Sequence, residues 1–152
     1  MKKNNILLLV SLLVIGTIIF IYFYFNNSYT LSFSAKIDLH NEKYQQAYEK
    51  AKQAYTLDHY NRMAFTVLNQ ASESLKWIDY IDETEGYLEK IAAISEKTYV
   101  KNDQLMRIKL MCDISNQRYQ KLYDSNMLQN QKLQEHAKQL NEKMQRIYSK
   151  LF

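Results

Sequence analysis

Proline is absent from this chain of 152 residues, and glycine occurs only twice, at Gly16 and Gly86. Strands joined by tight turns depend on these two residue types, so the composition favours helices over sheets. Gln, Lys, Glu, Leu and Ala are abundant instead, and all of them favour helices. The sequence therefore predicts an all-α fold class.

The residues needed for most catalytic and metal sites are also scarce. Cys112 is the only cysteine, which excludes an internal disulfide and a cysteine cluster for a metal ion. His40, His59 and His136 lie far apart in the sequence and show no metal-ligand spacing. Gly86 is the only glycine outside the apolar N-terminal block, so a glycine-rich phosphate loop is absent. We therefore predict that the protein is not an enzyme and uses no cofactor or metal ion.

A strong excess of one charge is missing as well. The chain has 20 Lys and Arg residues against 16 Asp and Glu residues, a formal net charge of +4. Nucleic-acid binding needs a denser basic face than this balance provides. We expect no nucleic-acid partner.

The N-terminal part contains an uncharged run of twenty residues, 6–25. As a helix, this run is long enough to cross a hydrocarbon layer of about 30 Å, and it exceeds the apolar region of a cleaved signal peptide, which has about 7–15 residues. Lys2 and Lys3 precede the run, and the next basic residue is Lys36. Because positive residues stay in the cytoplasm, we expect a cytoplasmic stub at residues 1–5, a single-pass transmembrane signal anchor at residues 6–25 in a bacterial inner membrane, and the remaining chain in the periplasm.

Small residues recur at helical spacing beyond this segment. Ala47, Ala51 and Ala54 fall on one face of a predicted helix, where their size allows a second helix to approach closely. Asp58 or Asn61 then serves as the N-cap of a further helix. This pattern resembles the tetratricopeptide repeat, a helical hairpin used in protein binding, although His59 stands where that family usually has proline. The resemblance implies that the packing positions of the repeat are Tyr44, Ala47, Ala51, Ala54, Leu57, Ala64 and Leu68.

The repeat-like domain is expected at residues 29–125, with its first helix at about residues 30–40 and a degenerate second repeat after Leu68. Asp82, Glu83 and Glu85 are interpreted as the solvated start of a helix. Residues 126–152 are predicted to form a separate C-terminal amphipathic helix with a heptad seam. The seam consists of Leu133, Ala137, Leu140, Met144, Ile147 and Leu151. Two interpretations stay open: the seam packs on the preceding hairpins as a capping helix, or it pairs with another copy or a partner.

Aromatic residues indicate how a partner is recognised. Tyrosine supplies a large contact area with little loss of side-chain entropy, which suits protein recognition. We select Tyr48, Tyr55, Tyr60 and Lys52 as candidate partner-binding residues, because Tyr48 and Tyr55 are offset from the alanine face. The predicted function is a membrane-anchored scaffold or assembly chaperone for protein partners of an inner-membrane or periplasmic complex, with secretion and flagellar motor complexes as analogies. The alternative is a structural spacer, a homo-oligomer that self-associates through the heptad seam.

Overall fold

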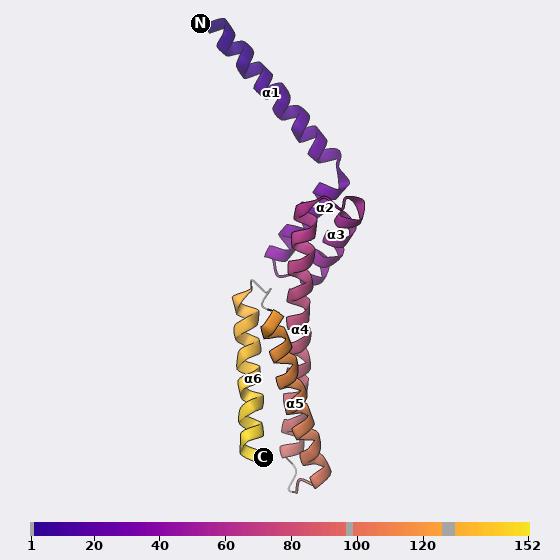
Figure 1. The fold of residues 1–152 in the computed structure, drawn as a ribbon, viewed down its shortest axis with the longest axis vertical. Coiled ribbons are helices and arrows are strands. Elements are labelled where there is room, and N and C mark those ends of the chain that lie inside the picture. Colours follow the sequence, from indigo (N-terminus) through magenta and orange to yellow (C-terminus); the bar gives the residue numbers. More distant parts are fainter. Residues whose placement is uncertain (1, 97–98, 126–129) are drawn as a thin grey trace. The chain divides into compact units, whose positions relative to one another are not determined.

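The computed structural model describes residues 2–96, 99–125 and 130–152, and within these ranges the chain forms six α-helices and no strand (Figure 1). Side chains are described throughout these ranges except at residues 2–7, 22–25 and 125. The helices are α1 (Lys2–Phe25), α2 (Asn27–His40), α3 (Tyr44–Leu57), α4 (Arg62–Ser95), α5 (Asn102–Ser125) and α6 (Gln131–Leu151). The prediction of an all-helical fold is confirmed.

Helix α1 covers the uncharged run of the sequence and most of the predicted stub, of which residue 1 lies outside the described residues. The side chains of residues 8–21 are all exposed. Among the residues that the structure describes, none of the helices combines the length and the apolar character that crossing a membrane requires.

The chain divides into two compact units, and the division falls inside α4. The N-terminal unit is Met1–Ala71 and the C-terminal unit is Ser72–Phe152. The sequence had predicted a different division, with a repeat-like domain at residues 29–125 and a separate helix at residues 126–152. Residues 126–129 of that predicted helix lie outside the described residues. The two divisions differ because α6 packs on α4 and α5 and shares their core.

In the N-terminal unit, α2 and α3 form a hairpin joined by residues 41–43. α2 begins a few residues before the predicted start and ends where expected. Its last turn closes as a Schellman motif, in which the backbone N–H groups of Glu42 and Lys43 donate to the carbonyls of Leu39 and Asp38. Glu42 has a φ of 60°, in the left-handed region that this motif requires and that glycine adopts at lower cost.

Small side chains fill the contact between α3, α2 and the first turns of α4. Ala35, Ala47, Ala51, Ala54, Ala64 and Ala71 are fully buried. Tyr44 is buried as well, and Leu68 is half-buried against the same cluster. The prediction that Leu57 packs in this core is wrong, because Leu57 is 60% exposed. It lies in the last turn of α3, at the edge of the face that the alanines form.

Helix α4 is 34 residues long. The degenerate second repeat predicted after Leu68 would require a turn in this stretch, which contains no proline. Gly86 is accommodated inside the helix, at a cost of about 1 kcal/mol relative to alanine. Asp82, Glu83 and Glu85 therefore lie in the middle of a helix, which corrects their interpretation as a helix start.

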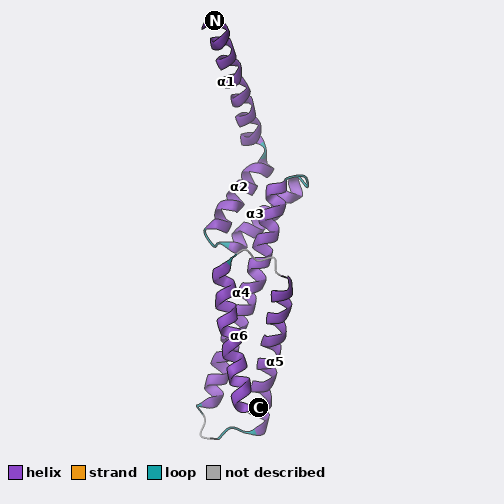
Figure 2. Ribbon diagram, turned by 60° about the vertical axis from the view of Figure 1, so that its left-hand side comes forward, coloured by secondary structure: helices purple, strands orange, loops and turns teal. Residues whose placement is uncertain are grey.

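In the C-terminal unit, the second part of α4 forms an antiparallel three-helix bundle with α5 and α6, as both views show (Figure 1, Figure 2). One core cluster joins α4 to α6, and α5 packs against it. A second cluster joins all three helices. The buried members of the two clusters are Trp77, Tyr80, Ile81, Ala137 and Leu140 in the first, and Ile91, Ile108, Cys112 and Met144 in the second.

The heptad seam of α6 faces this core. Ala137, Leu140 and Met144 are buried, while Leu133 and Ile147 are half-buried against the two clusters. The last seam position, Leu151, was expected to pack and is 46% exposed, because it is the final residue of α6 and has helical neighbours on one side only. Of the two interpretations of the seam, packing on the preceding helices is the arrangement observed within the chain.

Candidate functional site

A buried polar junction joins α2, the end of α3 and the start of α4. Asn61 is fully buried and caps α4, because its Oδ1 accepts a hydrogen bond from the backbone N–H of Ala64 at 3.1 Å. Its Nδ2 donates to the hydroxyl oxygens of Ser28 at 2.8 Å and Ser32 at 3.2 Å. The Ser28 hydroxyl donates in turn to the carbonyl of Ala54 at 2.8 Å. The junction uses both amide hydrogens of Asn61, which favours a single arrangement of the three helices.

Directly beside this junction, aromatic rings gather at the surface. The ring centroid of Tyr55 lies 4.9 Å from that of His59 and 5.8 Å from that of Phe65. We call Tyr55, His59 and Phe65 the aromatic cluster. Phe65 is 51% exposed, and Tyr60, next to His59 in the chain, is 94% exposed. Asp58 shapes the loop by accepting the backbone N–H of Tyr60 at 2.9 Å.

The four predicted partner-binding residues do not share one surface environment. Tyr55 belongs to the aromatic cluster, and Tyr60 is the most exposed of the four. Tyr48 is half-buried against the alanine-rich core. Lys52 places its ammonium nitrogen 5.8 Å from the centre of the Tyr48 ring, a cation–π distance. Of the predicted set, Tyr60 and Lys52 are exposed, whereas Tyr48 and Tyr55 are half-buried.

His59 and Phe65 are not among the contact residues predicted from the sequence. His59 lies in the loop and Phe65 in the first turns of α4, whereas Tyr55 lies in α3. Helical periodicity relates residues of one helix only, so it cannot predict that side chains from α3, the following loop and α4 lie together. The available signal was the loop at residues 58–61, which brings the two helices close together.

Helix α2 has an unusual distribution of polarity. Ser28, Ser32 and Asp38 are buried, whereas Phe33 is 60% exposed and Ile37 is 48% exposed on the opposite face. The serines are satisfied by the junction with Asn61. An apolar pair one turn apart is thereby left on the outside of the helix.

The burial of Asp38 is explained by an ion pair with α3. Lys50 Nζ lies 2.5 Å from Asp38 Oδ2 and donates to the Ser34 hydroxyl at 3.0 Å. The side chain of Asp38 is only 11% exposed, so an unpaired carboxylate there would be costly. This pair links the two helices of the hairpin.

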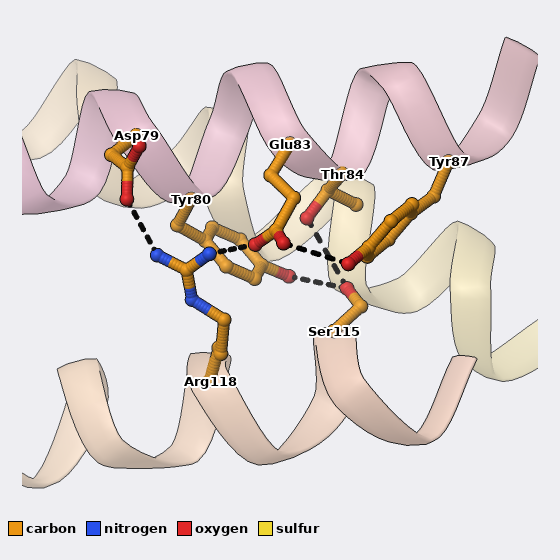
Figure 3. A network of polar contacts seen from close by, with 7 residues as sticks. All are labelled: Asp79, Tyr80, Glu83, Thr84, Tyr87, Ser115 and Arg118. Atoms are coloured by element: carbon orange, nitrogen blue, oxygen red, sulfur yellow. Dashed lines mark hydrogen bonds and ion pairs between the residues drawn. The ribbon is translucent and has the colours of Figure 1, made fainter. Parts of the chain in front are cut away.

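In the C-terminal unit, a polar network connects α4 to α5 (Figure 3). The guanidinium of Arg118 pairs with Asp79 at 2.7 Å and with Glu83. Glu83 also accepts a hydrogen bond from the Tyr87 hydroxyl at 2.7 Å. These groups lie near the surface, where solvent screens ion pairs, so each contributes at most about 1 kcal/mol.

Deeper in the same interface, three hydroxyl groups meet. The Ser115 oxygen lies 3.2 Å from the Tyr80 hydroxyl and 3.3 Å from the Thr84 hydroxyl. Burial raises the pKa of Tyr80 above its ordinary value of 10.0, although the two hydroxyl contacts act in the opposite direction. Since Ser115 contacts neutral hydroxyls, these bonds orient α4 against α5 and do not activate a nucleophile.

Among the residues that the structure describes, no group of three or more His, Cys, Asp or Glu side chains is arranged to hold a metal ion. Models of known protein families, curated proteins and solved structures give no match to this chain.

Proposed function

We propose that this protein is a single-pass, membrane-anchored scaffold or assembly factor whose tetratricopeptide-like hairpin binds another protein of the bacterial envelope. The single observation that carries the proposal is the aromatic cluster of Tyr55, His59 and Phe65, with Tyr60 beside it. Aromatic side chains are enriched in protein interfaces, where a rigid ring covers a large area with few rotatable bonds.

The rigidity of the underlying junction supports this assignment. Asn61 fixes the start of α4 against α2, and Ser28 fixes α2 against the end of α3. The loop that carries His59 and Tyr60 lies between these two anchored helices. A surface that is ordered before binding loses less entropy on association. The exposed pair Phe33 and Ile37 on α2 adds further apolar surface that a partner could cover.

The membrane anchor is supported by the sequence and by the exposure of α1. The uncharged run at residues 6–25 has twenty residues, and residues 8–21 are all exposed. Burying one large apolar side chain is favourable by about 1.5–3 kcal/mol, so such a helix favours an apolar environment. Lys2 and Lys3 favour a cytoplasmic N-terminus, which leaves the two compact units in the periplasm.

The alternative of a spacer that self-associates through α6 has less support. The seam residues Ala137, Leu140 and Met144 are buried in the bundle of their own chain. Pairing through the same residues would require α6 to leave that bundle and expose its core. The scaffold proposal requires no such rearrangement.

Site-specific photocrosslinking in cells tests the proposed binding surface. A photoreactive phenylalanine analogue replaces Phe65 in one variant and Tyr99 in a matched control, since Tyr99 is 77% exposed and lies outside the aromatic cluster. We expect one envelope protein to be captured through position 65 in near-stoichiometric amount and not through position 99. Equal capture at both positions, or none at position 65, would refute the proposed surface.

The proposed topology is tested separately by thiol labelling of the full-length chain. Cys112 is the only cysteine and is buried, so Cys112→Ala provides a silent background. A membrane-impermeant maleimide applied to intact spheroplasts should label Gln53→Cys and spare Lys3→Cys. Labelling of both after lysis is the control. The reverse pattern in intact spheroplasts would overturn the orientation without bearing on the aromatic cluster.

A further inference from the structure

The connection between α3 and α4 carries two large side chains that the fold leaves uncovered. Leu57, in the last turn of α3, is 60% exposed, and Tyr60 is 94% exposed. Arg62, the first residue of α4, follows two residues later and is exposed as well. We call Leu57, Tyr60 and Arg62 the tip. None of the three belongs to the aromatic cluster.

Hydrogen bonds fix the tip next to the start of α2. Asn61, between Tyr60 and Arg62, donates to the Ser28 hydroxyl at 2.8 Å, and that hydroxyl donates to the carbonyl of Ala54 at 2.8 Å. Ser28 follows the uncharged run by three residues, so it lies at most about 11 Å from the end of the run. The tip therefore lies close to the point where the chain leaves the proposed membrane segment, whatever the angle between α1 and α2.

The charges around the tip favour an anionic neighbour. Asp58 is the only acidic residue between residues 50 and 72, and its Oδ1 accepts the backbone N–H of Tyr60. The first turn of α4 contains no acidic residue and begins with Arg62. The positive end of the helix dipole disfavours a cation at this position. A phosphate group beside Arg62 would balance both the guanidinium and the helix end.

A phospholipid surface supplies the environment that these side chains require. The headgroup layer is about 5–8 Å thick on each side of the hydrocarbon core, and tyrosine rings settle at this depth. Two apolar side chains alone would hold a free protein on a bilayer only weakly. The anchor keeps the tip beside the bilayer, so the contact is intramolecular and needs no association step. A second protein is the competing occupant, and it would have to associate first.

We propose that the tip docks into the headgroup layer of the membrane that holds α1. Leu57 and Tyr60 lie among the lipids, and Arg62 pairs with the phosphate groups of anionic phospholipids. The proposal rests on the membrane anchor of the proposed function and not on its protein contact. Docking leaves the aromatic cluster uncovered and holds it close to the membrane surface.

Fluorescence quenching of the full-length chain in lipid nanodiscs tests the docking. The discs contain phosphatidylcholine and phosphatidylglycerol, and a fluorophore is attached to single cysteines in the Cys112→Ala background. Thr56→Cys lies beside the tip, whereas Gln46→Cys lies ten residues earlier on α3, about 15 Å away, and both positions are exposed. We expect lipids with a nitroxide on the headgroup to quench the label at position 56 more strongly than the label at position 46. Leu13→Cys, with a nitroxide on the acyl chain, reports separately on the anchor.

Matched variants identify the groups that make the contact. Replacing Leu57 and Tyr60 together with serine should reduce the quenching at position 56 to the level at position 46. Replacing Met106 and Leu110 together with serine should leave it unchanged, since these residues are an exposed apolar pair one turn apart on α5. Arg62→Gln should abolish the additional quenching that phosphatidylglycerol gives over phosphatidylcholine alone. This variant also serves if the serine substitutions at the tip lower the helix content by circular dichroism.

The outcomes separate the docking from the anchor. If the label at position 13 is quenched while positions 56 and 46 are quenched equally, the anchor stands, the tip is free for a protein partner, and the docking is overturned. An unquenched label at position 13 overturns both. Stronger quenching at position 46 than at position 56, or an equal loss in the α5 variant, also overturns the docking.

Discussion

Replacing Asn61 with alanine should destabilise the N-terminal unit more than the loss of an ordinary helix cap. The variant loses the cap to the Ala64 N–H, a loss of about 1 kcal/mol. It also removes the donor that serves the hydroxyls of Ser28 and Ser32, and each lost bond of this kind costs about 0.5–1.5 kcal/mol. We expect the opening free energy of this unit to fall by about 2–4 kcal/mol.

A matched cap in the other unit provides the reference. The Asn130 side chain accepts hydrogen bonds from the backbone N–H groups of Lys132 at 3.0 Å and Leu133 at 3.3 Å, and Asn130 is only half-buried. Asn130→Ala should therefore cost only about 1 kcal/mol, the usual value for an N-cap. The difference between the two variants measures the contribution of the buried junction.

Hydrogen–deuterium exchange of the full-length chain, read by mass spectrometry, resolves the two units. In Asn61→Ala, the amides of α3 should exchange roughly 30 to 1,000 times faster, since about 1.4 kcal/mol corresponds to a factor of ten. The amides of α5 should keep their wild-type rates. If α3 exchange rose less than tenfold, or no more than α6 exchange rises in Asn130→Ala, the reasoning about the junction would be refuted.

Three other perturbations have defined outcomes. Glu42→Gly should raise the free energy of unfolding by about 0.5–1 kcal/mol in urea titrations followed by circular dichroism, because the left-handed backbone at this position no longer carries a Cβ; a loss of stability would contradict this. Met144→Ala should lower the free energy of unfolding by about 2–5 kcal/mol, because Met144 is buried. The urea midpoint, measured by Trp77 fluorescence, should not depend on protein concentration. A concentration-dependent midpoint would indicate pairing of chains through α6. Burial raises the pKa of Tyr80 and Tyr119 above 10.0 in the folded chain. The stability that the two neutral phenol groups contribute is therefore fully present below about pH 10, and it is lost as the pH rises through their pKa values in the folded state. Urea midpoints between about pH 9 and pH 11 should therefore fall, less steeply in Tyr80→Phe, and a flat profile would contradict the assignment.

The sequence was sufficient for the local features that depend on one helix at a time. The absence of proline and the low glycine content led directly to an all-helical chain. The spacing of Ala47, Ala51 and Ala54 placed them on one face, and all three are fully buried. Asn61 was one of two candidate caps, and the structure selects it because its side chain reaches both α4 and α2.

The candidate surface was only partly predictable. Tyr55 was selected from residue type and helical offset, and Tyr60 from residue type alone. His59 and Phe65 join Tyr55 only because the loop brings α3 and α4 together. The outward position of Phe33 could not be foreseen. A periodic pattern would turn the apolar side of α2 inward, whereas the hydrogen bonds of the junction turn its serines inward instead.

Helix content, the alanine face and the amphipathic stripe of α6 were determined by the sequence alone, because propensity and periodicity act over a few turns of one helix. The tertiary structure decided which surface each stripe covers. The seam of α6 would be satisfied equally by its own chain or by a second copy, and only the packing against α4 and α5 shows that Leu140 and Met144 are used within the chain. The physical reason is that the hydrophobic effect is not directional and does not select a particular partner surface. Which surface the apolar stripe of α6 covers therefore depends on which surfaces lie next to it in the folded chain.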